Sequence, residues 1–181
     1  MKLLNLPNTL TLSRIFLIPV ICLLYYIGFN GWNYWAAVIF ILASVTDLFD
    51  GMAARKLGEV TDFGKFIDPI ADKLLVMSIL LMLQEWKNIP SWVNIILLGR
   101  EFIISGFRLV AAQKGVVIAA GKSGKWKTAT QMAALAILLL DNLLFKNLGI
   151  PMGEILLYIS VALSVYSCTE YIVKNINVIK E

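Results

Sequence analysis

Residues 47–73 read DLFDGMAARKLGEVTDFGKFIDPIADK and bring four aspartates into a chain that is otherwise strongly apolar. Asp47 and Asp50 are spaced i,i+3, and Asp68 and Asp72 are spaced i,i+4, so each pair shares one face of a helix. An antiparallel hairpin that turns midway between the two pairs would bring all four carboxylates to a similar depth. Carboxylates in one pocket repel one another unless cations neutralise them. The stretch therefore predicts a metal site on a helical hairpin.

The chain around this stretch has the composition of a membrane protein. Its 181 residues are 59% hydrophobic and only 15% charged. Residues 15–46 carry no charged side chain and are interrupted only by a turn-like sequence at residues 28–31. A membrane-spanning helix needs about 20 mostly apolar residues, so this run can hold two crossings. We interpret the chain as an integral membrane protein with a single domain over residues 1–181.

The apolar segments predict an all-α fold of six transmembrane helices, preceded by a short N-terminal interfacial segment. The predicted helices cover residues 13–29, 33–55, 61–84, 91–113, 125–144 and 153–174. If both termini lie in the cytoplasm, Lys87 and Lys146 alone among the Lys and Arg residues fall at the outer ends. We therefore expect a multi-pass protein of the cell membrane, with both termini and the aspartates on the cytoplasmic side.

The type of metal follows from the type of ligand. The chain has no histidine, and carboxylate oxygens without His or Cys select Mg²⁺, Mn²⁺ or Ca²⁺. Two divalent ions ~3.5–4 Å apart are a recurrent arrangement for displacing phosphoryl groups. Two other interpretations are that the aspartates conduct ions across the membrane, or that they only pair with nearby cations, namely Arg55, Lys56, Lys65 and Lys73.

The same stretch resembles the complete signature of the CDP-alcohol phosphotransferase family. All eight defined positions are filled at the family spacing: Asp47-x2-Asp50-Gly51-x2-Ala54-Arg55-x8-Gly64-x3-Asp68-x3-Asp72. The resemblance implies that a CDP-linked phosphatidyl group is transferred to an alcohol and that CMP is released. It also implies two divalent cations, Mg²⁺ or Mn²⁺, a six-helix membrane domain and a homodimer, with membrane lipid and no nucleic acid as partner.

The resemblance assigns roles to individual positions. It makes Asp47, Asp50, Asp68 and Asp72 the metal ligands, and Asp72 also the general base that acts on the acceptor hydroxyl. The positions assigned to binding CDP are Asn8, Thr11, Gly51, Ala54, Arg55 and Gly64.

Three further stretches resemble the family members that use CDP-diacylglycerol as donor and glycerol 3-phosphate as acceptor: Pro7-Asn8-x2-Thr11-x2-Arg14, Asp68-Pro-x-Ala-Asp-Lys73, and Gly99-Arg100-Glu101 with Arg108. A dianionic phosphate needs cations, and the candidates are Arg100, Arg108 and Lys125. Arg100 can instead pair with Glu101 or Glu170. Lysines near the start of the fifth helix can instead anchor the chain on anionic lipid, the interpretation we favour for Lys127.

Several alternatives stay open. The acceptor can instead be inositol phosphate, serine or phosphatidylglycerol. Outside this reaction class, intramembrane carboxylates also suit a divalent-cation transporter, and a scaffold without catalysis is a third class.

Overall fold

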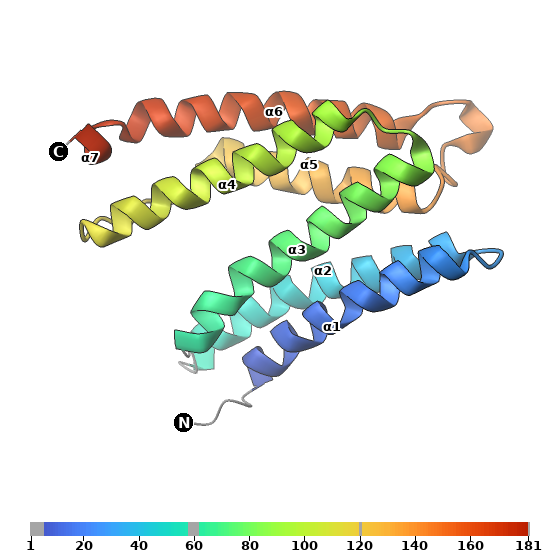
Figure 1. Cartoon of the computed structure of the whole chain (residues 1–181), viewed down its shortest axis with the longest axis horizontal. Coiled ribbons are helices and arrows are strands. Elements are labelled where there is room, and N and C mark those ends of the chain that lie inside the picture. Colours follow the sequence, from blue (N-terminus) through green and yellow to red (C-terminus); the bar gives the residue numbers. More distant parts are fainter. Residues whose placement is uncertain (1–5, 58–61, 120, 181) are drawn as a thin grey trace. The chain divides into compact units, whose positions relative to one another are not determined.

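The computed structural model describes the backbone of residues 6–57, 62–119 and 121–180, and the side chains of residues 11–46, 67–119 and 121–178. Over these residues the chain is helical and contains no strand, which confirms the all-α prediction. Figure 1 shows the helices in chain order: α1 (Leu6–Ile27), α2 (Trp32–Leu57), α3 (Asp62–Lys87), α4 (Ser91–Gln113), α5 (Lys122–Leu139), the 3₁₀ helix η1 (Lys146–Leu148), α6 (Met152–Asn175) and α7 (Asn177–Lys180).

The first helix is longer than predicted. It begins at Leu6 and runs without a break to Ile27, so most of the segment expected to lie at the membrane interface ahead of the first helix is part of that helix, and its interfacial location stays a prediction. Pro7 lies in the first turn, where a helix needs no backbone N–H from it and its fixed φ angle suits helical geometry. Residues 6–12 therefore belong to α1.

The fifth helix is shorter than predicted, because it ends at Leu139 and not near residue 144. Asp141 and Asn142 have φ angles of 55° and 53°, in the left-handed region that Asn and Asp tolerate better than most residues. The backbone N–H of Asn142 donates to the carbonyl of Ile137 at 3.0 Å, closing the helix end. The left-handed backbone conformation of these two residues therefore ends α5 before the predicted position.

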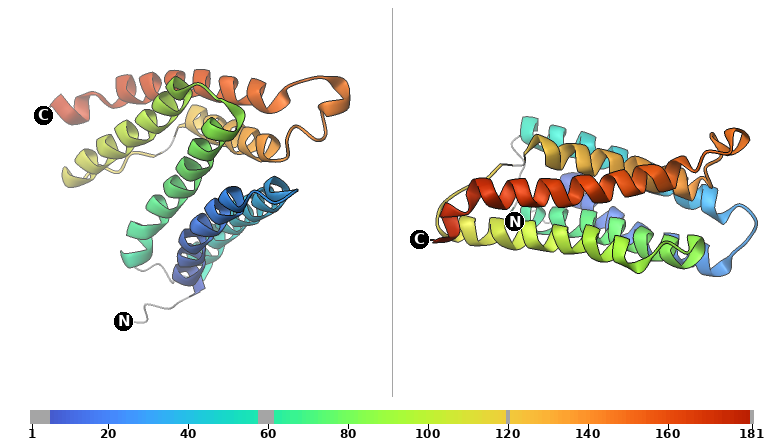
Figure 2. Two further views of the ribbon diagram at one scale, coloured as in Figure 1. Left: turned by 45° about the vertical axis from the view of Figure 1, so that its right-hand side comes forward. Right: turned by 90° about the horizontal axis from the view of Figure 1, so that it is seen from above.

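Contacts divide the chain into two compact units, and the first comprises Met1–Met82 with Leu139–Asp141. Within it α1 and α2 pack side by side (Figures 1 and 2). Small buried side chains on α2, among them Ala36, Ala37 and Ala43, let the helices approach closely. Gly28 and Gly31, both with positive φ, form the predicted turn between these helices.

The second unit comprises Leu83–Leu138 with Asn142–Glu181. Its helices α4 and α6 lie side by side, as both views in Figure 2 show. Ile104 and Phe107 of α4 pack with Tyr171 of α6 in one buried cluster. The Phe107 and Tyr171 rings meet edge to face, with their centroids 5.6 Å apart.

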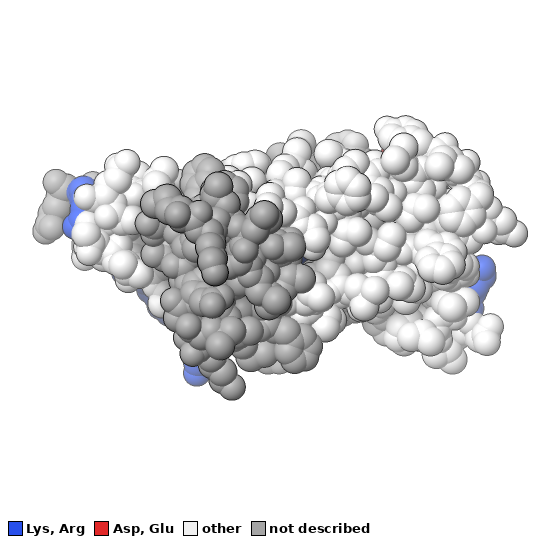
Figure 3. Space-filling view, turned by 90° about the horizontal axis from the view of Figure 1, so that it is seen from below, with Lys and Arg blue, Asp and Glu red and all other residues white. Residues whose placement is uncertain are grey.

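Large apolar side chains are exposed while polar ones are buried. Phe16, Phe102 and Leu144 are among the exposed residues, whereas Arg14 and Lys127 are buried. On the described part of the face in Figure 3, most of the surface is uncharged. Among the described residues, only Met152–Asn175 is both long and apolar enough to cross a membrane, and Thr11–Ile27 and Trp32–Thr46 are shorter apolar segments.

Candidate active site

Two polar contacts in the first unit join α1 to the aspartates of α3. The hydroxyl of Thr11 donates a hydrogen bond to Oδ1 of Asp68. One turn further along α1, Nη1 of Arg14 lies 2.6 Å from Oδ1 of Asp72 and forms an ion pair with it. Because both residue numbers increase together, α1 and α3 run in the same direction at this level. Asp68 and Asp72 are thus both held by the same neighbouring helix.

Burial differs between the two members of the ion pair. The Arg14 side chain is 3% exposed, whereas the Asp72 side chain is 43% exposed. A buried guanidinium is costly to leave unpaired, so Arg14 is anchored by Asp72 while Asp72 stays accessible on its outer side. Hydrogen bonds of this kind orient a carboxylate for a further partner. Sequence reasoning gave Arg14 no role in the site, although a charge one turn from Thr11, directly before the uncharged run at residues 15–46, was an available signal.

The other predicted metal and CDP residues have no described side chains. Asp47, Asp50, Gly51, Ala54 and Arg55 lie on α2. Gly64 lies on α3 and Asn8 on α1. Their helical backbone confirms the helices on which the spacing argument depends, but their side chains lie outside the described residues. Among the side chains that are described, no three acidic, Cys or His groups gather in one place. The four-aspartate site therefore stays a prediction.

The two described aspartates fit an oxygen-binding divalent ion. Asp68 and Asp72 are one turn apart on α3, partly exposed, and offer only hard carboxylate oxygens. Each receives one hydrogen bond from α1 through Oδ1, which orients the carboxylate plane. This donor chemistry suits Mg²⁺ or Mn²⁺ better than metals that prefer nitrogen or sulfur.

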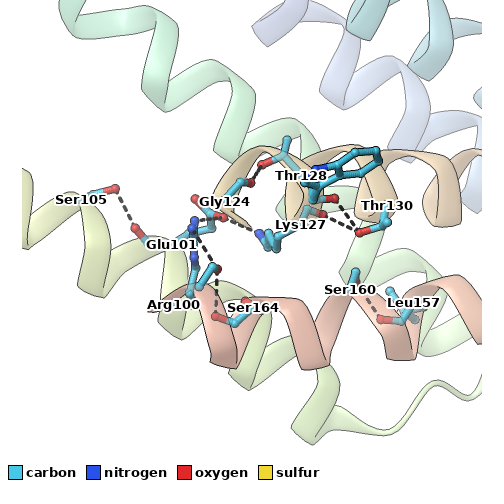
Figure 4. Close-up of polar contacts among 12 residues, drawn as sticks. Arg100, Glu101, Ser105, Gly124, Lys127, Thr128, Thr130, Leu157, Ser160 and Ser164 are labelled. Atoms are coloured by element: carbon cyan, nitrogen blue, oxygen red, sulfur yellow. Dashed lines mark hydrogen bonds and ion pairs between the residues drawn. The ribbon is translucent and has the colours of Figure 1, made fainter. Parts of the chain in front are cut away.

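The second unit holds the predicted phosphate-binding arginines. Arg100 donates through Nη1 to Oε1 of Glu101 at 3.0 Å and through Nη2 to the hydroxyl of Ser167 at 3.4 Å. The expected alternative pairing with Glu101 is therefore present, while Glu170 accepts hydrogen bonds from Ser123 and Lys174. Figure 4 shows Arg100 and Glu101 on α4 facing α5.

Arg108 and Lys125 have different surroundings. Nε of Arg108 donates to the hydroxyl of Tyr171 at 3.3 Å, and its guanidinium lies 5.5 Å from the centre of that ring. Lys125 is exposed in the first turn of α5. Neither arrangement prevents a contact with a phosphate, since an arginine carries five N–H donors and a lysine three.

The interpretation of Lys127 as a lipid-anchoring surface lysine is wrong. Its side chain is 1% exposed, and Nζ forms an ion pair with Oε1 of Glu101. A buried ammonium needs such a partner, because removing an unpaired charge from water is very costly. The helical face of α5 that carries Lys127 therefore turns toward α4 (Figure 4).

The sequence of the chain, including the aspartate-bearing stretch, matches a known enzyme family. The CDP-alcohol phosphatidyltransferase family matches residues 4–166, and the chain belongs to this family. The match confirms the resemblance found in the signature and makes the chain a member of a transferase family.

Individual relatives carry a more specific name. Proteins named CDP-diacylglycerol–glycerol-3-phosphate 3-phosphatidyltransferase include one from Bacillus subtilis (strain 168), 42% identical over 97% of each chain. One from Rickettsia typhi (strain ATCC VR-144 / Wilmington) is 44% identical over 92% of this chain and 94% of its own. One from Haemophilus influenzae (strain ATCC 51907 / DSM 11121 / KW20 / Rd) is 38% identical over 93% of this chain and 91% of its own. The similarity thus extends well beyond the signature.

Proposed function

We propose that this chain transfers the phosphatidyl group of CDP-diacylglycerol to glycerol 3-phosphate, forming phosphatidylglycerophosphate and releasing CMP. The observation that carries the choice of acceptor is the shared name of relatives that are 38% to 44% identical over at least 92% of this chain. The signature alone leaves the acceptor open, and similarity along nearly the whole chain includes the residues outside it.

The proposed metal centre consists of two divalent cations, Mg²⁺ or Mn²⁺, held by Asp47, Asp50, Asp68 and Asp72. Members of the family generally depend on divalent metal. Bound divalent ions would neutralise negative charge on the phosphoryl oxygens during an in-line displacement.

The residues of α1 would orient this centre. Thr11 holds Asp68 and Arg14 holds Asp72, so both carboxylates have a fixed direction before substrate arrives. Asp72 would accept the proton of the acceptor hydroxyl at a carboxylate oxygen, and the exposure of its side chain supports access from outside the protein.

The CDP moiety would lie against small residues and hydrogen-bonding groups. Gly51, Ala54 and Gly64 would leave room for the nucleotide beside the helix backbones, and Arg55 would stabilise charge on the leaving CMP. Asn8 would contact the nucleotide from α1. Thr11 is assigned to the same site, and its bond to Asp68 supports a contribution through that carboxylate.

The phosphate of glycerol 3-phosphate would bind to cations of the second unit. Arg100, Arg108 and Lys125 are the proposed ligands, because arginine matches phosphate oxygens with paired N–H groups and lysine adds a point charge.

We also propose that α1 to α6 cross the cell membrane, with both termini and the active site cytoplasmic, and that the protein is a homodimer. The exposed large apolar side chains on several helices support lipid contact, as do the buried polar groups. The family supports a membrane location.

The test is CMP release by the purified protein from CDP-diacylglycerol with Mg²⁺ and a panel of acceptors: glycerol 3-phosphate, inositol phosphate, serine and phosphatidylglycerol. We expect glycerol 3-phosphate to give the highest kcat/KM, because its phosphate is the group that the basic residues would bind. Asp68→Asn is the inactive control, since it removes the carboxylate charge while conserving the side-chain size. The proposal fails if glycerol 3-phosphate releases no more CMP than the blank while another acceptor does.

A further inference from the structure

Three charged groups form a cluster in the second unit that carries one more positive than negative charge. Arg100 and Glu101 come from α4, and Lys127 comes from α5 (Figure 4). Both cations bind the same atom, Oε1 of Glu101, Arg100 at 3.0 Å and Lys127 at shorter range. The three side chains are 12%, 25% and 1% exposed, respectively. One carboxylate thus serves two cations in a mostly buried place.

The exposure and the hydrogen-bond partners of the two cations show which of them depends on Glu101. Lys127 is the most buried of the three, and Glu101 is its only partner among the described residues. Arg100 is more exposed, and Glu101 and Ser167 use two of the five N–H donors that an arginine carries. Its buried Nε has no acceptor among the described residues. Arg100 therefore has unused N–H donors and some exposure, whereas the ammonium of Lys127 is almost completely buried.

A glycine on α5 keeps this arrangement compact. A Cβ atom added at Gly124 would lie 3.2 Å from Nη2 of Arg100, so a larger residue there would require the guanidinium to shift by a few tenths of an ångström. Ser167 of α6 contacts the same Nη2 group from another element. The guanidinium of Arg100 is thus held by hydrogen bonds to α4 and α6, with the backbone of Gly124 on α5 close to it.

We propose that Lys127 is a positioning residue that neutralises Glu101, and thereby leaves the charge of Arg100 available for the phosphate of the acceptor. Without Lys127, Glu101 would neutralise Arg100, and a dianionic phosphate would meet a pair with no net charge. The proposal rests on the function proposed above and adds a residue that the signature does not contain. Lys127 need not touch the substrate, because it acts through Glu101.

The net charge of the cluster predicts different effects of two single variants on the KM for glycerol 3-phosphate. Lys127→Met lowers the charge of the cluster by one, and we expect the KM for glycerol 3-phosphate to rise by about tenfold or more, the size of one charged hydrogen bond. Glu101→Gln raises the charge by one while an amide oxygen still accepts from Arg100, so KM stays unchanged or falls. The double variant restores the original charge, and its KM should return to within about twofold of wild type.

The measurement is steady-state CMP release in detergent, with each substrate varied in turn. The KM for CDP-diacylglycerol should change little in all three variants, and the inhibition constant of inorganic phosphate against glycerol 3-phosphate should follow the KM of the acceptor. Lys122→Met is the matched control, because it removes an exposed lysine from the first turn of the same helix.

The proposal is overturned if Lys127→Met leaves the acceptor KM unchanged. It is also overturned if Glu101→Gln raises the acceptor KM as much as Lys127→Met does, since the two substitutions would then act by disturbing the structure and not by changing the charge. Where Glu101→Gln does not fold, the double variant decides, because it removes the buried ammonium of Lys127 together with its carboxylate partner: a KM as high as that of Lys127→Met overturns the proposal. CMP release by the wild type with glycerol 3-phosphate tests the proposed function separately, and only the ratios among variants test the role of Lys127.

Discussion

At the scale of single residues, the orientation of the aspartates depends on the side chains that bind them. Asp72 pairs with Arg14, and Asp68 accepts a hydrogen bond from Thr11. The donors lie 57 and 58 residues away along the chain, so these contacts orient the carboxylates only once the first unit has folded. Groups that orient metal-binding side chains commonly affect activity almost as strongly as the ligands themselves.

Replacing Thr11 by Val tests this orientation directly. The change keeps the shape of the side chain and removes the hydroxyl that donates to Asp68. We expect activity at a fixed Mg²⁺ concentration to fall by about 10- to 100-fold, the usual effect of losing such a partner, and the Mg²⁺ concentration for half-maximal rate to rise. The measurement is a Mg²⁺ titration of CMP release.

Thr11→Ser is the matched control for this prediction, because it retains the hydroxyl and loses only a methyl group. It should keep most of the activity. If Thr11→Val and Thr11→Ser give the same Mg²⁺ titration curve, the bond to Asp68 does not support metal binding.

At the scale of helices, close packing and helix ends place the polar groups of the second unit. The side chain of Asn142, just beyond α5, accepts a hydrogen bond from the backbone N–H of Gly153 at 2.7 Å and donates to Glu154 at 2.9 Å. It therefore caps the start of α6 from outside that helix. Leu138 packs against Gly153 at the same point, which leaves no space for a larger residue there.

Gly153→Ala tests the packing at this helix start. The added Cβ would lie 2.8 Å from Cγ of Leu138 and 3.0 Å from Oδ1 of Asn142. Overpacking of this kind costs about 1–3 kcal/mol, so the variant should unfold at a lower temperature, as followed by intrinsic fluorescence in one detergent.

Gly106→Ala is the control for this packing test, since an added Cβ at Gly106 meets nothing within 4 Å inside α4. Alanine there should stabilise the helix by about 0.5–1 kcal/mol. An equal change of melting temperature in both variants would contradict the packing argument.

At the scale of the whole molecule, the two units contain different parts of the proposed chemistry. The first holds Asp68 and Asp72 with their partners from α1, and the second holds Arg100 with Glu101 and Lys127. Both units bury polar groups and expose large apolar side chains. That distribution suits lipid as the surrounding solvent, because charged groups in a membrane are stable only when they are paired or enclosed by protein.

The proposed topology can be tested by labelling of single cysteines in cells, after Cys22 and Cys168 have been replaced. Val117, between α4 and α5, is 94% exposed, and Leu144, between α5 and α6, is 75% exposed. We expect Leu144→Cys to react with a membrane-impermeant maleimide in intact cells, and Val117→Cys only after permeabilisation. The reverse pattern would contradict the orientation, and reaction of both in intact cells would contradict a crossing by α5.

Helix positions and family could be predicted well from the sequence. The uncharged run at residues 15–46, with its turn, predicted the end of α1 and the whole of α2 closely, and the signature around Asp47 and Asp68 predicted a family that the match over residues 4–166 confirms. These features are local: periodicity, turn residues and spacing lie within a few residues of one another. The end of α5 was misplaced because the left-handed backbone at Asp141 and Asn142 interrupts a run that composition alone would continue.

The pairing of charges depended on the fold. Sequence reasoning left Arg100 with two possible acidic partners, gave Arg14 none, and interpreted Lys127 as a surface lysine, whereas the structure buries Lys127 against Glu101. Residue type and spacing determined the helices, the acidic pairs and the reaction class. Which cation meets which carboxylate is decided by packing between segments distant in sequence, because the electrostatic energy of a pair depends on separation and burial, and both exist only in the folded chain.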